Sequence, residues 1–219
     1  ERYLGMKVAA FAATGYQPRD ELTYVVHSEV GQQMGRFAMR DDRTMFLFVF
    51  ADPSAEIPTE LETQKALLRD RYSRSGWESA EILRRLDAAD TLYLDRVSQI
   101  RLDAWTRGRV ALVGDAAFCP SLLAGQGTAL AMVAAYVLAG ELKRAAGDHE
   151  AAFSKYHERL SAFISGKQEG AIGLASFFAP KSRAAMFIRN QVMRVMSLRF
   201  VAELAIGREI QDRVDLPDY

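Results

Sequence analysis

Hydrophobic and polar residues alternate with the period of β-strands through the first quarter of the chain. Four runs rich in apolar, β-branched or aromatic residues occupy residues 4–13, 22–30, 33–40 and 44–51. Gly15, a turn at 41–43 and Asp52-Pro53 separate or close these runs. The pattern predicts four strands in an antiparallel meander, one face of which must be covered by other elements.

After residue 57 the apolar residues recur mainly at helical spacing. The predicted elements are, in order, a helix from Pro58-Thr59-Glu60, a helix over 77–89, a strand over 91–102, a turn over 105–108, a short buried strand over 109–113, a helix over 125–146 and a helical region over 149–207. We expect the last region to be broken at 166–173, where glycines recur, and at Pro180.

Composition narrows the classes of protein. The chain has 219 residues, 28 basic and 28 acidic, and 49% are hydrophobic, which is typical of a globular protein. A net charge of zero without a Lys/Arg block argues against a nucleic-acid-binding protein. The single cysteine, Cys119, excludes an intramolecular disulfide framework. His27, His149 and His157 are too few to suggest a histidine-based metal centre, so we expect no metal site.

The start of the chain and its longest apolar runs indicate where in the cell the protein is expected. No apolar run reaches the roughly 18 residues of a membrane span, and Glu1-Arg2-Tyr3-Leu4 is not typical of a signal peptide. We therefore expect no membrane span and a cytoplasmic protein. The chain begins without Met and enters strand-like sequence at once, so we expect it to be a piece of a longer protein.

The segment Arg109–Glu141 has the features of a ligand-binding loop. A short apolar run ends at Gly114-Asp115, and open α/β folds place ligands at the carboxyl ends of strands. The Asp115 carboxylate suits a sugar-like diol. Gly125-Gln126-Gly127 then opens a helix whose free N–H groups attract partial negative charge. The alternative is that Asp115 only caps the loop and the glycines only turn the chain, because a short glycine pattern is a weak signal.

The string GRVALVGDAA, followed by a short loop and AGQG, resembles the second flavin-binding motif of the class A flavoprotein monooxygenases. This family has the para-hydroxybenzoate hydroxylase fold and includes the tetracycline-inactivating monooxygenases. The resemblance covers most of the chain but is of motif grade only over 107–127. Other segments that are similar to the family are 95–100, Trp105, Gly207-Arg208 and Leu216-Pro217-Asp218-Tyr219.

The resemblance implies a flavin site in this segment. The aspartate equivalent to Asp115 holds the ribityl chain of FAD, and backbone N–H groups at the helix start face the pyrimidine edge of the flavin. The implied cofactor-binding residues are Gly114, Asp115, Pro120, Ala124, Gly125, Gln126, Gly127 and Thr128. The chain departs from the family pattern at Phe118, at Ser121-Leu122 after Pro120, at Ala129 and at Ala134.

The implied fold is α+β. It comprises an antiparallel substrate-binding sheet with covering helices over 1–102, the C-terminal part of an FAD-binding α/β domain over 103–165, and trailing helices over 166–219. The family begins with a strand and a GxGxxG motif that bind the ADP half of FAD, and neither occurs in this sequence. The expected partner is therefore an N-terminal Rossmann portion of the same protein, in the same or a separate chain.

The implied activity is hydroxylation of an aromatic or polyketide-like small molecule with FAD, O2 and NADH or NADPH. We nominate no catalytic acid or base. One alternative is a reductase or halogenase of the same fold, although the Trp-rich motif expected of halogenases is absent. Another is a binding fragment without activity of its own.

Other candidate residues have simpler interpretations. Either face of the predicted sheet could line an apolar pocket, but packing against helices is the more economical explanation. We expect His27, His149 and His157 to be surface groups, and Arg96 to form a salt bridge rather than to contact the flavin. Cys119 has no base or cation beside it in sequence, which predicts an inert thiol. The C-terminal residues Phe177, Phe178, Met186, Phe187, Met193, Met196 and Phe200 could form a membrane-surface helix, but packing on the sheet or on a partner is favoured.

Overall fold

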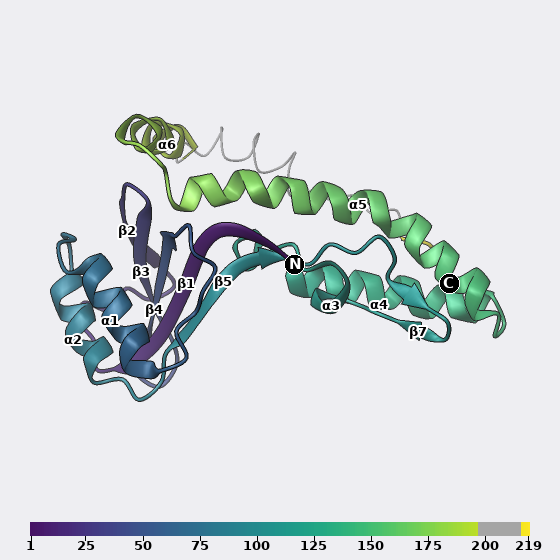
Figure 1. The fold of residues 1–219 in the computed structure, drawn as a ribbon, viewed down its shortest axis with the longest axis horizontal. Helices are drawn as coiled ribbons and strands as arrows, with labels where there is room; N and C mark the ends of the chain where they lie inside the picture. Colours follow the sequence, from purple (N-terminus) through teal and green to yellow (C-terminus); the bar gives the residue numbers. More distant parts are fainter. Residues whose placement is uncertain (197–215) are drawn as a thin grey trace. The chain divides into compact units, whose positions relative to one another are not determined.

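The computed structural model describes residues 1–196 and 216–219, and the chain divides into two compact units (Figure 1). Unit 1 comprises Glu1–Leu4, Ser98–Ala175 and Ile188–Tyr219, and unit 2 comprises Gly5–Val97 and Ser176–Phe187. Gly207-Arg208 and Phe200, named in the sequence analysis, lie outside the described residues. The mixture of helices with an antiparallel sheet confirms the α+β class.

A five-stranded sheet in the order β2-β3-β4-β1-β5 forms the centre of unit 2. The strands are β1 (Arg2–Thr14), β2 (Tyr24–Glu29), β3 (Gln32–Ala38), β4 (Arg43–Ala51) and β5 (Tyr93–Gln99). All four strands predicted in the first quarter of the chain are confirmed, but the four-strand meander is wrong. The strand β1 pairs antiparallel with β4, in a register that aligns Val8 with Val49, and not with β2. This order brings the two most apolar strands together inside the sheet and leaves the more polar β2 at the edge.

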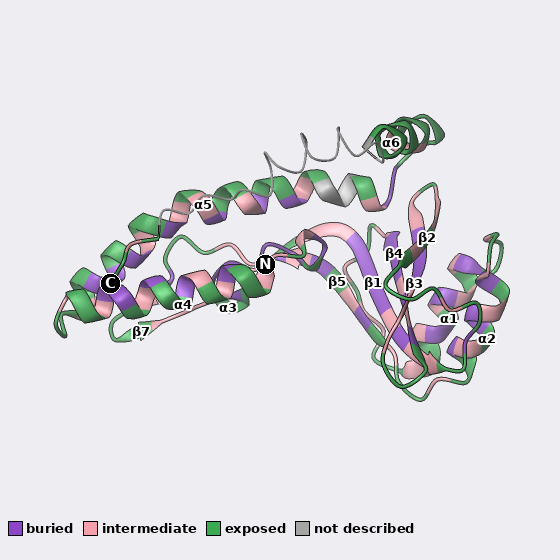
Figure 2. Ribbon diagram, turned by 180° about the vertical axis from the view of Figure 1, so that it is seen from behind, coloured by how far each residue is buried: buried purple, intermediate pink, exposed green. Residues whose placement is uncertain are grey.

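Two helices cover one face of this sheet and confirm the helices predicted after residue 57. They are α1 (Leu61–Tyr72) and α2 (Ser79–Asp87). The alternating residues Phe46, Phe48 and Phe50 of β4 are fully buried in one cluster with apolar residues of both helices. Figure 2 shows the buried stretches of β1 and β4 and the buried faces of α1 and α2. The period-2 pattern of β4 and the helical spacing of α2 thus meet in one apolar core.

The remaining elements begin with a two-stranded hairpin, β6 (Thr106–Arg107) and β7 (Val110–Ala111). They continue as α3 (Asp115–Phe118), the 3-10 turn η1 (Leu122–Ala124), α4 (Gly127–Arg144), α5 (His149–Phe178) and α6 (Arg183–Met196). Trp105, Phe118 and facing residues of α4 and α5 form the core of unit 1.

Two predictions about these elements are wrong. Residues 109–113 do not form a buried strand: β7 has two residues, and Val110 is 63% exposed. Within the described part of the chain β7 pairs only with β6, so its outer side has no neighbouring strand. The second error is the break at 166–173, because α5 runs through it. A helical glycine costs about 1 kcal/mol relative to alanine, and the buried Ile164, Gln168 and Ala171 hold the helix in place. The break at Pro180 is confirmed.

The C-terminal tetrapeptide docks on the second half of α4. Tyr219 donates a hydrogen bond from its hydroxyl to Glu141 Oε1 over 2.7 Å, and Tyr136 donates to the Pro217 carbonyl over 3.0 Å. The Tyr219 ring lies against Gly140, where a β-carbon would overlap it. The absence of a side chain at Gly140 therefore leaves the space that the Tyr219 ring occupies.

Several apolar residues of α6 are exposed, and the expected packing on the sheet or on a partner stays a prediction. Phe187 is 63% exposed, Ile188 62% and Met193 50%. None of the helices among residues 1–196 combines the length and the apolar character of a membrane span.

Candidate functional site

The residue Gly114 places Asp115 against the start of α4. Gly114 is buried and has a φ of +68°, in the region that favours glycine. A β-carbon at this position would lie 3.0 Å from that of Ala131 in α4, so the chain passes as close to the helix as a glycine allows. Asp115 then begins α3 with an exposed side chain. A β-carbon built on Gly127 would lie 3.4 Å from Asp115 Oδ1, so the carboxylate and the first residue of α4 are neighbours.

The start of α4 offers free N–H donors. Its N-cap residue, Gln126, makes no side-chain capping bond, and the first bond within the helix runs from Leu130 N to Gln126 O over 3.0 Å. The N–H groups of Gly127, Thr128 and Ala129 therefore precede the first possible acceptor within the helix. They form the positive end of a helix of 18 residues. Gly125, just before it, is exposed and has a φ of +65°.

The loop between α3 and α4 runs through a strained residue. Pro120 is buried, and Ser121 after it has a φ of +105°, which a residue with a side chain rarely adopts. Ser121 Oγ accepts a hydrogen bond from Leu123 N over 3.2 Å and starts the turn η1. The turn ends at Gly125, whose N–H donates to the Leu122 carbonyl.

A hollow of about 420 Å³ borders the end of this loop. Ala124 and Gln126 form one wall, and the other wall belongs to α5. The α5 wall consists of Gly166, Lys167, Gly170, Ala171 and Gly173. A β-carbon at any of these three glycines would meet no atom within 4 Å, so this side of α5 is open beside Gln126.

Cys119 lies in the same loop, and its surroundings disfavour a thiolate. Burial raises the pKa of the thiol, and its hydrogen bond to the Asp115 carboxylate and the charge of that group raise the pKa further, while a backbone bond at Ser121 acts in the opposite direction. A reactive cysteine needs the reverse, a lowered pKa. The geometry supports the interpretation of Cys119 as an inert residue of the loop.

The predicted site residues thus lie in one continuous region of unit 1, from Gly114 to Thr128. The three histidines lie elsewhere and each contacts an aromatic ring. His27 stacks on Trp77 and lies 3.1 Å from Glu29, His157 packs edge-on against Trp105, and His149 against Phe153. Arg96 is exposed on β5. Among the described residues no group of three or more His, Cys, Asp or Glu side chains could hold a metal ion.

Two buried polar residues beside the loop, Gln99 and Gln168, were not predicted from the sequence. Gln99 is fully buried and Gln168 is 6% exposed. The signal for Gln99 was available in the sequence, because it occupies an inward position of β5, two residues after the buried Val97. A polar residue at an inward position of a strand needs a hydrogen-bonding partner. Here the partners are the carbonyls of Pro120 in the loop and of Gln168 in α5.

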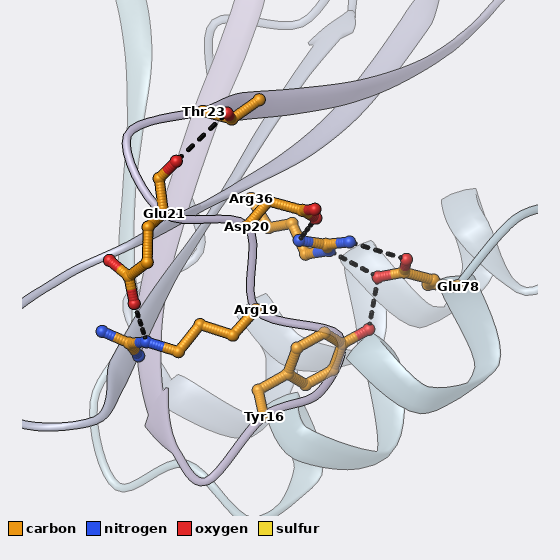
Figure 3. Close-up of polar contacts among 7 residues, drawn as sticks. All are labelled: Tyr16, Arg19, Asp20, Glu21, Thr23, Arg36 and Glu78. Atoms are coloured by element: carbon orange, nitrogen blue, oxygen red, sulfur yellow. Dashed lines mark hydrogen bonds and ion pairs between the residues drawn. The ribbon is translucent and has the colours of Figure 1, made fainter.

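A second missed cluster lies in unit 2 (Figure 3). Arg36, on the helix-covered face of β3, donates to both carboxylate oxygens of Glu78 over 2.6 and 3.0 Å and to Asp20 over 2.8 Å. Tyr16 also donates to Glu78, over 2.7 Å. Burial, followed by this bond, raises the pKa of the Tyr16 hydroxyl above its usual range. These hydrogen bonds all join members of the cluster to one another, which indicates a structural role.

Comparisons with known proteins show the family of the chain. The sequence profile described as FAD binding domain matches residues 2–165. A flavin-dependent monooxygenase of an unknown prokaryotic organism is 34% identical over 218 residues, covering 99% of this chain and 54% of the relative. One from Legionella longbeachae is 37% identical over 177 residues, covering 81% of this chain and 43% of the relative. The chain therefore spans about half the length of these relatives.

Two solved structures are similar as well. The tetracycline destructase Tet(55) superposes with a TM-score of 0.81 at 31% identity, over 100% of this chain and 56% of that one. Klebsiella pneumoniae HpxO, in complex with FAD and uric acid, has a TM-score of 0.71 at 23% identity, over 88% of this chain and 49% of that one. The second similarity concerns the fold alone.

Proposed function

The chain belongs to the FAD-binding family of flavin-dependent monooxygenases, and on that premise we propose that the loop from Gly114 to Thr128 holds the flavin half of FAD. The observation that carries the proposal is the approach of the exposed Asp115 carboxylate to the bare start of α4 at Gly127. An acceptor for sugar hydroxyls and a set of free N–H donors thereby lie side by side. The hollow beside Ala124 and Gln126 supplies space directly before the start of α4.

The proposal assigns roles to several residues of this loop. Asp115 accepts hydrogen bonds from hydroxyl groups of the ribityl chain. The N–H groups of Gly127 and Thr128 donate toward the pyrimidine edge, where negative charge gathers. Gly125 presents backbone only, so a planar ring can approach it closely. Ala124 lines the hollow, and Pro120 is buried in the loop before it.

The reaction we propose is hydroxylation of an aromatic or polyketide-like small molecule with O2 and NADH or NADPH, in a cytoplasmic enzyme. When bound, FAD supplies the redox chemistry, and the residues of this chain bind it, orient it and stabilise negative charge at its pyrimidine edge. Relatives named as monooxygenases and a neighbour named as a tetracycline destructase support this reaction class.

We assign substrate binding to the sheet region, residues 1–102. The face of the sheet opposite α1 and α2 carries Tyr24, Phe37 and Met45, which the register of β2, β3 and β4 aligns across the strands. The Tyr24 and Phe37 rings lie 6.0 Å apart, edge to face. An apolar, aromatic face of this kind suits a planar ring. In this assignment residues 103–165 are the C-terminal part of the FAD-binding domain, and residues 166–219 are trailing helices.

The test of the cofactor site is Asp115→Ala in the full-length protein. The loss of charge-assisted hydrogen bonds should weaken FAD binding about tenfold or more. Flavin content is measured as the ratio of visible to protein absorbance after dialysis. Asp103→Ala, at an exposed aspartate of the same unit, is the matched control and should retain FAD. Equal flavin content in both variants would contradict the proposal.

We also propose that a dinucleotide-binding portion, in the same or a separate chain, contacts the pyrophosphate and adenosine of FAD. The support is the absence of a strand–GxGxxG–helix pattern from the sequence together with the greater length of the relatives. Residues 1–219 expressed alone should therefore elute colourless from gel filtration and become yellow together with that portion. A yellow 219-residue species with stoichiometric FAD would refute this proposal.

A further inference from the structure

Two buried glutamines join three segments of unit 1 beneath the loop. Gln99, at the end of β5, donates from Nε2 to the Pro120 carbonyl over 3.0 Å and to the Gln168 carbonyl over 2.6 Å. Its Oε1 accepts a hydrogen bond from Arg101 Nε over 3.0 Å. Both N–H groups and the oxygen of this fully buried amide are thus used within the protein.

Gln168 binds the same loop from the side of α5. Its Nε2 donates to the Ile100 carbonyl over 2.7 Å and to the Cys119 carbonyl over 3.4 Å. Cys119 O also accepts a bond from Ile100 N over 3.2 Å. The carbonyls of two consecutive loop residues, Cys119 and Pro120, are therefore both fixed by glutamine side chains.

The position of these bonds in the loop gives them their significance. Cys119 and Pro120 lie between Asp115 and Gly125, and they directly precede the strained Ser121. A residue with a side chain keeps a positive φ only where its surroundings hold it there. If the two carbonyls were released, Ser121 could relax, and the distance between the carboxylate and the start of α4 would no longer be fixed.

Apolar packing alone does not explain two glutamines here. Methionine would fill a similar volume without the cost of burying an amide. A buried polar network in which every group is hydrogen-bonded also fixes orientation, because each N–H donor bonds its carbonyl well in only one arrangement. We propose that Gln99 and Gln168 are positioning residues that hold the Cys119–Pro120 carbonyls and thereby set the geometry between Asp115 and the α4 start. This inference rests on the proposed function, that FAD is held between these two groups.

The test uses Gln168→Met and Gln99→Met in the full-length protein, with Gln64→Met as the control. Gln64 also donates from Nε2 to a backbone carbonyl, that of Pro58, but it lies in unit 2. FAD affinity is measured by quenching of flavin fluorescence, together with the visible spectrum of bound flavin and the Tm without FAD. Each loop variant should bind FAD roughly tenfold more weakly and shift the flavin spectrum. The control should lower only the Tm.

The outcomes separate this inference from the proposed function. A wild-type protein that binds no FAD overturns both. A wild-type protein that binds FAD, together with loop variants that have a lower Tm but unchanged affinity and spectrum, overturns this inference alone, because such glutamines would only support the fold. If Gln99→Met does not fold, Gln168→Met decides the matter, since its position on α5 is slightly exposed.

Discussion

The polar cluster of unit 2 and the polar loop of unit 1 use similar residues in opposite ways. In unit 2 the side chain of Arg36 is 4% exposed, and its guanidinium is bound by Glu78 and Asp20 (Figure 3). In unit 1 Asp115 is exposed, and the start of α4 lacks a side-chain cap. A closed cluster stabilises a fold, whereas donors and acceptors left open beside a hollow are available to a ligand.

The apolar residues of the two units do not differ in this way. Phe46, Phe48 and Phe50 of β4 are completely buried under α1 and α2. Val110 of β7 is 63% exposed, and Met132 of α4 is 69% exposed. Both units therefore bury an apolar core of their own, and both leave apolar residues exposed, including Leu22 and Tyr24 in unit 2. The difference between the units lies in their polar groups, and substitutions should reveal it as loss of stability in the closed cluster and loss of binding in the open loop.

The largest loss of stability should follow Glu78→Ala. The change leaves the buried Arg36 charge without its main partner, and breaking a buried ion pair costs about 3–5 kcal/mol. The measurement is urea unfolding followed by the fluorescence of Trp77, whose ring lies 5.6 Å from the Arg36 guanidinium carbon. Replacing Trp105, the other of the two tryptophans, with Phe in both proteins isolates this signal.

The matched control for this prediction is Glu81→Ala in α2, the helix that begins directly after Glu78. Glu81 pairs with Arg84 and Arg85, whose side chains are 74% and 36% exposed. Such surface pairs contribute about 1 kcal/mol or less. Equal losses for Glu78→Ala and Glu81→Ala would contradict the view of the unit 2 cluster as a closed structural element.

A smaller effect on stability is expected at Gly140, against which the C-terminal Tyr219 packs. Gly140→Ala puts a β-carbon into the Tyr219 ring and should destabilise unit 1 by about 1–3 kcal/mol. Gly166→Ala, on the open side of α5, meets no atom within 4 Å. It should stabilise the protein by about 0.5–1 kcal/mol, because alanine is the better helix former. Thermal unfolding of both variants would show opposite shifts in Tm, and an increase for both would be evidence against the docked tail.

The pH dependence of stability should contain a contribution from Glu141. Burial alone would raise the pKa of this carboxyl, but hydrogen bonds from Tyr219 and Arg159 outweigh it, so the pKa lies below the usual 4.5. A carboxylate with a lowered pKa stabilises the fold above its unfolded pKa, and this contribution disappears as the pH falls through the folded pKa.

The measurement for Glu141 is the free energy of unfolding between pH 6 and about pH 3. Glu141→Gln should lose stability at pH 6, by about 1 kcal/mol, and should show a flatter decline toward acid than the wild type. Glu150→Gln, at an exposed residue of the first turn of α5, controls for the change in net charge. A wild-type slope retained in Glu141→Gln would show that the titration of Glu141 makes no such contribution.

The smallest effect is expected for Cys119→Ser. Burial and the neighbouring Asp115 carboxylate raise the pKa of the thiol, so no thiolate chemistry should be lost. A serine hydroxyl can replace the thiol as donor to Asp115. FAD content and turnover should match the wild type, and stability should change by roughly 0.5 kcal/mol or less. Loss of turnover with intact flavin content would assign the thiol a role.

The elements and the central motif could be predicted from the sequence because their causes are local. Alternation in β4, helical spacing in α2 and the Gly-Asp and Gly-Gln-Gly strings depend on neighbouring residues only. The order of the strands could not be predicted, because the pairing of β1 with β4 depends on which strands bury each other. The continuity of α5 through Gly166 and Gly170 could not be predicted either, because packing by residues elsewhere in the chain offsets the low helix propensity of glycine.

The sequence by itself determined the α+β class, the family and the stretch from Gly114 to Thr128 that carries the candidate site. Only the tertiary structure decided that Asp115 lies against Gly127. It also decided that Gln99 and Gln168 bind the carbonyls of Pro120 and Cys119, which lie between Asp115 and Gly127 in the sequence. The physical reason is the distance along the sequence over which each kind of interaction acts. Strand and helix signals act over a few residues, whereas a buried hydrogen bond joins whichever segments the packed core brings together, here segments that lie 21 to 69 positions apart.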